Sequence, residues 1–193
     1  MTKQLLNTKF VTPEIVCSFP SLFEPSDYGD KPKYQLSIPI PYAEEAALKE
    51  INQCIINAAV NKWGEKAKAQ VGKSIEVVVR DFSEKYEEDD PVYANTKFFT
   101  AKSDKRPGIV DNKLKPIMDE DEIYAGCIVR AAVTFYAYEF KGKKGVAAGL
   151  NNVMKVRDGE PLGGRSNAED DFASYKATGT DDFVPSDEPG NVF

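Results

Sequence analysis

The chain has 193 residues, of which 41% are hydrophobic and 29% charged, and its formal net charge is −6; this length suits one ordinary domain with a real core. The absence of histidine excludes imidazole general bases, Ser-His-Asp and Cys-His nucleophile systems, and most zinc or iron ligand sets. Cys17, Cys54 and Cys127 are scattered without a CxxC pair, which favours buried free thiols over a disulfide or a metal site.

Two β-strands are predicted near the amino end, EIVCSFPSLF (14–23) and KYQLSIPIP (33–41), with the loop EPSDYGDKP (24–32) between them. A helix is predicted from Tyr42 to Trp63, and Gly64 is its stop signal. The apolar residues that share one face of this helix are Leu48, Ile51, Ile55, Ala59 and Trp63.

The rest of the chain as far as residue 156 is strand-like, with charged or Gly/Pro-containing turns between the strands. Several short strands with one helix predict a mainly β fold, either a small β-barrel or a curved sheet. The predicted strands are SIEVVVRD (74–81), VYANTKFFTAK (92–102), PGIVD (107–111), CIVRAAVTFYAYEF (127–140) and GVAAGLNNVMKV (145–156).

The excess negative charge lies at the carboxyl end. Residues 1–165 contain 24 Lys and Arg and 24 Asp and Glu, whereas residues 166–193 contain seven acids and one base, Lys176. We therefore predict one domain over residues 1–165, neutral overall and able to carry a basic face. An acidic, flexible C-terminal tail over residues 166–193 is predicted to follow it.

The strand 129–140 and the turn after it combine rings with positive charge. Alternate residues of a strand face opposite sides, and the set Val129, Ala131, Val133, Phe135 and Ala137 suits a core. The other set runs into a lysine-rich turn and comprises Arg130, Ala132, Thr134, Tyr136, Tyr138, Phe140, Lys141, Lys143 and Lys144. Single-stranded nucleic acid offers base faces that stack on rings and phosphates that attract cations. The alternative is that the tyrosines cover a hydrophobic edge and the lysines solvate a turn.

A second strand repeats the pattern. In VYANTKFFTAKSDKRPG (92–108) one face is predicted to collect Tyr93, Lys97 and Phe99, and the following loop adds Lys102, Lys105 and Arg106. A solvated strand edge is the alternative for each segment alone. Because the aromatic and basic pattern recurs in two separate β-elements, nucleic-acid binding is the favoured interpretation.

The tail is predicted to bind partner proteins or to occupy the protein's own basic groove by mimicking phosphates. A plain solubilising tail is the alternative. The residues predicted to form the partner-binding part are Asp181, Asp182, Phe183, Asp187, Glu188 and Phe193.

Other candidate chemistry is weak. The acidic runs DEDE (119–122) and EEDD (87–90) lack EF-hand spacing, and neither GKKG nor PLGGR matches the phosphate-binding GxxxxGK[ST] pattern. We therefore expect neither a metal nor a cofactor. No apolar run approaches the roughly 18–20 residues that cross a bilayer, and MTKQLLNTKF lacks the apolar core of a signal peptide. A cytoplasmic protein without membrane contact is expected.

Several strings resemble the bacteriophage single-stranded DNA-binding proteins long catalogued as a family of unknown function. They are RPGIVD (106–111), YAGC (124–127), VTFYAY (133–138), GVAAGLNNV (145–153) and, most specifically, KVRDGEPLGGRSNAEDDF (155–172). The resemblance implies an OB-fold barrel that coats single-stranded DNA in the host cytoplasm during phage replication or recombination, without strong sequence preference and without catalysis. It also implies that the acidic tail recruits replication or recombination proteins.

The sequence thus predicts a mainly β, OB-fold-like barrel with one main helix and an acidic tail, which is not an enzyme and binds single-stranded DNA. A homodimer is left open. The alternative function is a protein-interaction or DNA-mimic module that acts through the tail. The predicted DNA-binding residues come from the strand-face argument and are Lys97, Phe99, Lys102, Lys105, Arg106, Arg130, Tyr136, Tyr138, Lys141, Lys143 and Lys144.

Overall fold

The computed structural model describes residues 5–27, 29, 31–82 and 92–162, all within the first of two units, Met1–Gly163. The predicted tail, with every residue predicted to bind partners, lies outside the described residues. The strands are β1 (Lys9–Val11), β2 (Ile15–Val16), β3 (Ser18–Ser26), β4 (Lys33–Pro41), β5 (Ile75–Val77), β6 (Arg80–Asp81), β7 (Thr96–Ser103), β8 (Gly108–Val110), β9 (Ile128–Phe140) and β10 (Lys143–Arg157). The helices are α1 (Glu45–Trp63) and the short 3-10 helices η1 (Glu65–Gln70) and η3 (Glu120–Glu122).

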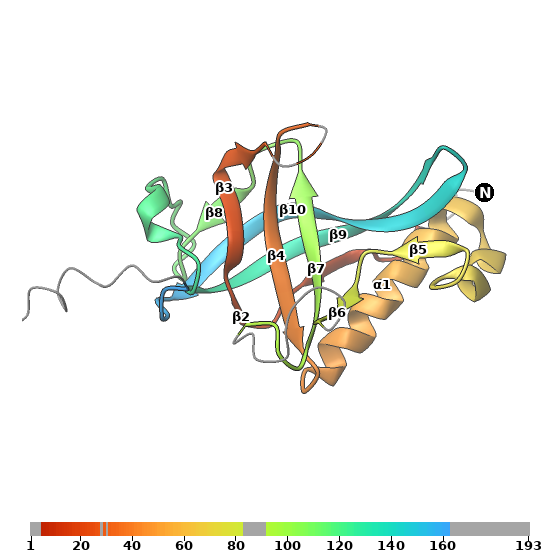
Figure 1. The fold of residues 1–193 in the computed structure, drawn as a ribbon, viewed down its shortest axis with the longest axis horizontal. Helices are drawn as coiled ribbons and strands as arrows, with labels where there is room; N and C mark the ends of the chain where they lie inside the picture. The colour runs from red at the N-terminus through yellow and green to blue at the C-terminus, as the bar shows by residue number, and fades with distance from the viewer. Residues whose placement is uncertain (1–4, 28, 30, 83–91, 163–193) are drawn as a thin grey trace, which may run out of the picture. The chain divides into compact units, whose positions relative to one another are not determined.

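The strands form one mixed sheet whose main path is β1–β9–β10–β7–β4–β3. Along this path β10 is parallel to β7, and the other neighbours are antiparallel. β2 pairs with β9, and only Cys17 separates β2 from β3, so one continuous segment connects the two edges of the sheet. A curled sheet joined in this way is the arrangement of an OB-fold barrel. The predicted fold class is confirmed (Figure 1).

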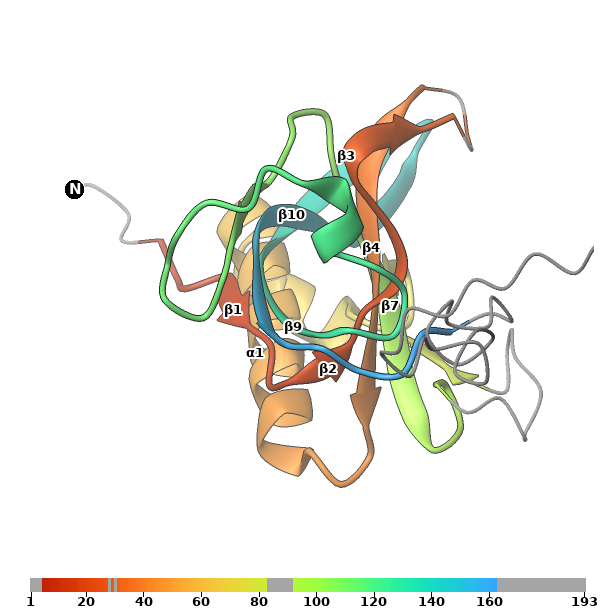
Figure 2. The same ribbon diagram turned by 90° about the vertical axis from the view of Figure 1, so that its left-hand side faces the viewer.

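Backbone hydrogen bonds hold this junction. The Cys17 N–H donates to the Cys127 carbonyl at 2.8 Å, and the Gly126 N–H donates to the Cys17 carbonyl at 2.9 Å. All three cysteines are free and buried, as predicted. In Figure 2, β9 and β10 curve around one side of the sheet's interior while β4 and β7 stand on the other.

The core lies between the inner face of the sheet and α1. The inward set predicted for β9 is confirmed, since Val129, Ala131, Val133 and Phe135 are at most 1% exposed. The helix ends at Trp63 as predicted and begins three residues later than expected, at Glu45, after Pro41 has ended β4. It contributes Ile51, Cys54, Ile55, Ala58 and Ala59 to the same cluster.

A long hairpin of β9 and β10 carries much of the sheet. Its register runs from Lys143 opposite Phe140 to Arg157 opposite Ile128. The turn residues Lys141 and Gly142 have φ of +49° and +78°. Two left-handed residues in a two-residue turn suit the twist of the flanking strands. In Figure 1 the hairpin continues beyond β7 to the right, where β10 pairs with β5.

Candidate nucleic-acid interface

The outer face of β9 continues across β10, β7 and β4. Tyr136 is opposite Ala147, and Tyr138 is opposite Gly145. Further along β10, Gly149 lies beside Lys102 of β7, and Lys102 is opposite Gln35 of β4. Residues paired across a sheet share a face, so the rings of β9 and the ammonium group of Lys102 lie on the same side of the sheet.

Small residues on β10 give the tyrosine rings their position. A Cβ on Gly145 would lie 2.5 Å from Cζ and Oη of Tyr138, and a Cβ on Gly149 would lie 3.6 Å from Cε1 of Tyr136. The rings therefore lie across the backbone of β10 and do not stand upright from β9. Tyr136 remains 47% exposed and Tyr138 36% exposed, so both rings keep surface that a flat ligand can cover.

A groove of about 590 Å³ opens on this outer face. It draws residues from β4, β6, β7, β9 and β10, and from the loop between β3 and β4. Its lining consists of Gly29, Lys31, Lys33, Val78, Arg80, Phe98, Phe99, Thr100, Lys102, Tyr136, Ala147 and Ala148.

The groove is basic. Lys31, Lys33, Arg80 and Lys102 line it, and no carboxylate occurs among the described residues of its lining. At the rim, Lys33 Nζ lies 3.2 Å from Oδ1 of Asp104, whose side chain is 77% exposed. An exposed ion pair of this kind contributes little free energy and is readily exchanged for another anion. The groove thus offers cations and a ring edge to a flexible polyanion.

The predicted face of β7 is wrong. Lys97 and Phe99 share a face of β7 with Ala101, which is 0% exposed, so this set lies on the core side of the strand. Phe99 is only 1% exposed and its ring packs against that of Phe135 at 5.5 Å. A ring enclosed in this way cannot stack a base, so the prediction for Phe99 is withdrawn; the outer face carries Phe98, Thr100 and Lys102.

Lys97 is engaged with an acid. Its Nζ lies 3.5 Å from Asp81 Oδ2, and the Tyr42 hydroxyl donates to Asp81 Oδ1 at 2.7 Å. The hydrogen bond from Tyr42, followed by the charge of Lys97, holds the pKa of Asp81 below its usual value. Asp81 therefore stays ionised and partners Lys97 at the end of the strand.

The lysine turn divides between two faces. Lys143 pairs with Phe140 and shares the outer face with Gly145, whereas Lys144 shares the inner side with Val146. Lys144 accordingly lies over the Trp63 ring, with Nζ 5.4 Å from its centroid. The turn is also remote from the 102–106 region, because Lys102 lies beside Gly149, roughly 16 Å along the strand from Lys144 at about 3.3 Å per residue. The prediction that Lys144 shares a face with Tyr136 and Tyr138 is therefore wrong.

Three further predicted cations lie away from the groove lining. Arg106 lies over the Phe23 ring at 4.8 Å. Lys105 is exposed in the loop after β7. Arg130 donates to the Thr12 carbonyl at 3.3 Å and lies 3.7 Å from Glu14 Oε1. A hydrogen bond from Arg157, together with the charges of Arg157 and Arg130, lowers the pKa of Glu14.

The sequence interpretation missed Lys31, Lys33 and Arg80. Lys31 and Lys33 lie in DKPKYQL, around the loop between β3 and β4, and Arg80 is the second-to-last residue of the predicted strand SIEVVVRD. Basic residues at the ends of predicted strands are candidates for phosphate contacts, and this pattern was visible in the sequence. The pairing of β6 with β7 places Arg80 opposite Phe98, and the pairing of β4 with β7 places Gln35 opposite Lys102. These long-range pairings bring the basic residues into the lining of one groove.

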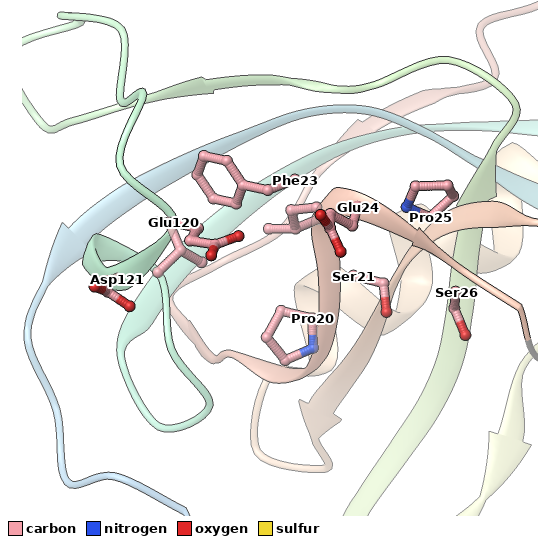
Figure 3. Close-up of a pocket in the computed structure, with 10 residues that line it drawn as sticks. Pro20, Ser21, Phe23, Glu24, Pro25, Ser26, Glu120 and Asp121 are labelled. Atoms are coloured by element: carbon pink, nitrogen blue, oxygen red, sulfur yellow. The ribbon is translucent and has the colours of Figure 1, made fainter.

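A second concavity has the opposite charge. It measures about 460 Å³ and lies along β3 beside η3. Figure 3 shows the carboxylates of Glu24, Glu120 and Asp121 around it, with Phe23 and the two prolines of β3. Carboxylates repel phosphate, so this site is unsuited to a nucleic-acid backbone.

Two kinds of feature are absent from the described residues. No helix in them is long and apolar enough to cross a membrane. Nor do those residues contain a group of three His, Cys, Asp or Glu side chains placed to hold a metal ion.

The described residues thus form a mainly β, OB-fold-like domain with one main helix and a basic groove that Tyr136 also lines. The chain belongs to the family described as the single-stranded DNA-binding protein of Enterobacter phage Enc34, which matches residues 8–184. A curated relative, "Putative protein p50" of Acyrthosiphon pisum secondary endosymbiont phage 1, is 33% identical over 155 residues, covering 76% of this chain and 82% of its own.

Solved structures agree on the fold. The bacteriophage Enc34 single-stranded DNA-binding protein in complex with ssDNA superposes with a TM-score of 0.70 at 24% identity, over 81% of this chain and 90% of that one. A C-terminal truncation of the Enc34 protein superposes with a TM-score of 0.68 at 25% identity, over 80% of this chain and 89% of that one. The bacteriophage T7 single-stranded DNA-binding protein gp2.5 superposes with a TM-score of 0.59 at 16% identity, over 94% of this chain and 100% of that one.

Proposed function

We propose that the protein binds single-stranded DNA in the basic groove and coats it without strong sequence preference, without catalysing a reaction. The observation that carries the proposal is the groove itself, in which Lys31, Lys33, Arg80 and Lys102 stand beside the exposed ring of Tyr136. Family membership supports it, as does the ssDNA complex of the Enc34 protein.

The chemistry of the groove favours unpaired DNA over a duplex. Cations spaced along a curved face follow the phosphates of a flexible strand, while rings need an exposed base face that a duplex keeps inside its stack. Stacking on rings does not distinguish one base from another. Lys143, opposite Phe140, and Lys141, whose Nζ lies over the Phe140 ring, extend the positive charge along the hairpin. Lys105, which is exposed, adds positive charge beyond β7.

We further propose that the protein acts in phage DNA replication or recombination, with the acidic tail recruiting replication proteins. The supporting observation is the charge division of the sequence, with seven acids and one base in residues 166–193. An acidic segment can bind a basic surface of a partner or compete for the basic groove.

Fluorescence-anisotropy titration of labelled dT oligonucleotides at several salt concentrations tests the function. Binding should weaken with salt, with a logarithmic slope near −0.7 for each phosphate contacted. A duplex of equal length should bind more weakly.

A chain ending at residue 172 should bind the oligonucleotide equally or more tightly and lose capture of replication proteins. If the full-length protein does not bind the dT oligonucleotide at low salt, the result would instead support the DNA-mimic alternative.

Gly145→Ala should weaken oligonucleotide binding several-fold, because the new methyl group displaces the Tyr138 ring from the backbone of β10 and removes a prepared stacking surface. Gly149→Ala is the matched control on the same face of the same strand, where the added Cβ meets Tyr136 at an ordinary contact distance of 3.6 Å. Anisotropy titrations of both variants, with melting curves to verify folding, would contradict the role of Tyr138 if the two affinities were equal.

A further inference from the structure

Phe19 is an exposed aromatic residue at the start of β3, close to the junction that joins the edges of the sheet. Its side chain is 62% exposed, and its φ is +45°. A bulky residue in the left-handed region is uncommon and costs conformational free energy. Because Phe19 is mostly outside the core, burial does little to offset that cost. Strained, exposed residues of this kind concentrate at ligand-binding sites.

The Phe19 ring is held by a ladder of aromatic contacts. It stacks on Tyr93 with ring centroids 6.5 Å apart and planes 25° apart. Tyr93 is itself 1% exposed, and its hydroxyl lies 2.8 Å from Ser18 Oγ. The Tyr93 ring meets Phe98 edge-on at 5.3 Å. Phe19 therefore presents one covered face to the protein and leaves the other available to a second flat group.

This ladder leads into the basic groove. Phe98 and Thr100 both line the groove. Thr100 is opposite Ser37 of β4, and Ser37 is opposite Ser18 of β3, so Ser18 begins a row that crosses the sheet to the groove. Phe19 thus stands on the β3 side of the groove, whereas Tyr136 and Tyr138 stand on the β9 side.

We propose that Phe19 is a second base-stacking site, which takes an unpaired nucleobase on its exposed face. The proposal rests on the proposed function and extends it: the strand crosses the cations of the groove with bases held on rings at both sides. The base approaches a ring that is already oriented by Tyr93, so little side-chain freedom is lost on binding.

Phe19→Ala tests the site in a dT oligonucleotide series of increasing length. Short oligonucleotides that occupy only the groove and the tyrosine side should bind the variant and the parent protein equally. Longer oligonucleotides that reach β3 should bind the variant about tenfold more weakly. Phe19→Trp should restore that affinity, and the added indole emission, measured against the Trp63 background, should change on binding of the longer oligonucleotides alone.

Leu114→Ala is the matched control, because Leu114 is 72% exposed and has φ of +63°, yet does not line the groove. It should bind every oligonucleotide as the parent does. Equal affinity of Phe19→Ala and the parent at all lengths would overturn the proposal, and a loss that tracks a lowered melting temperature would show that Phe19 only covers Tyr93. Either result leaves the proposed function intact, since that fails only if the parent itself does not bind.

Discussion

Replacing Lys33, Arg80 and Lys102 together by alanine is expected to weaken binding of a dT oligonucleotide about a hundredfold at low salt. The three cations come from β4, β6 and β7 and line one groove. If each neutralises one phosphate, the logarithmic salt slope should become less steep by roughly 2. Anisotropy titrations at four or more salt concentrations measure both quantities.

The matched control removes the same charge elsewhere. Lys66, Lys68 and Lys73 are exposed and lie outside the groove lining. Their triple replacement by alanine lowers the net charge equally, so it should produce only a small, long-range loss of affinity. Equal losses for the two triple variants would mean that net charge, and not the groove, determines binding.

The double variant Tyr136→Ala with Tyr138→Ala is expected to bind the oligonucleotide more than tenfold more weakly, because two base-stacking surfaces are removed. Its salt slope should match that of the parent protein, since no phosphate contact is lost. This combination of a large loss with an unchanged slope distinguishes stacking from charge. Titration of the variant beside the parent at two salt concentrations suffices to measure it.

Tyr42→Ala serves as the comparison, because Tyr42 is 37% exposed, similar to Tyr138, but precedes α1 and contacts Asp81. It should leave affinity nearly unchanged. Should the double variant, with an intact melting transition, retain the parent's affinity, the rings of β9 would have no part in binding. The outer face of the β9–β10 hairpin would then no longer be part of the proposed DNA-binding surface.

The alternation of β9 could be predicted because its two faces differ sharply in chemistry. Apolar residues alternate with Arg130, Thr134, Tyr136 and Tyr138. Only one orientation of the strand therefore turns the apolar set toward the core. In β7 the adjacent pair Phe98 and Phe99 is buried on both faces, at 4% and 1% exposure. The Tyr93 ring covers Phe98 on the outer face. A strand with apolar residues on both of its faces does not show from its sequence which face packs against the core.

The groove could not be predicted as a unit because its members are brought together by long-range pairing. Lys33, Arg80 and Lys102 are far apart in the sequence and come to line one groove through the β4–β7 and β6–β7 pairings. β1 escaped prediction because three residues, KFV, give too short a pattern. Its position depends on β9, to which it pairs through Lys9 and Thr134.

The segment that joins the sheet's edges has a consequence for biosynthesis. β1 and β2 leave the ribosome well before their partner β9, which lies more than a hundred residues later in the chain. At a bacterial rate of about 5–20 residues per second, these strands wait roughly 6 to 25 s for their partner. The sheet can therefore be completed only after β9 has been synthesised, and until then the apolar side chains of β1 and β2 are available to chaperones.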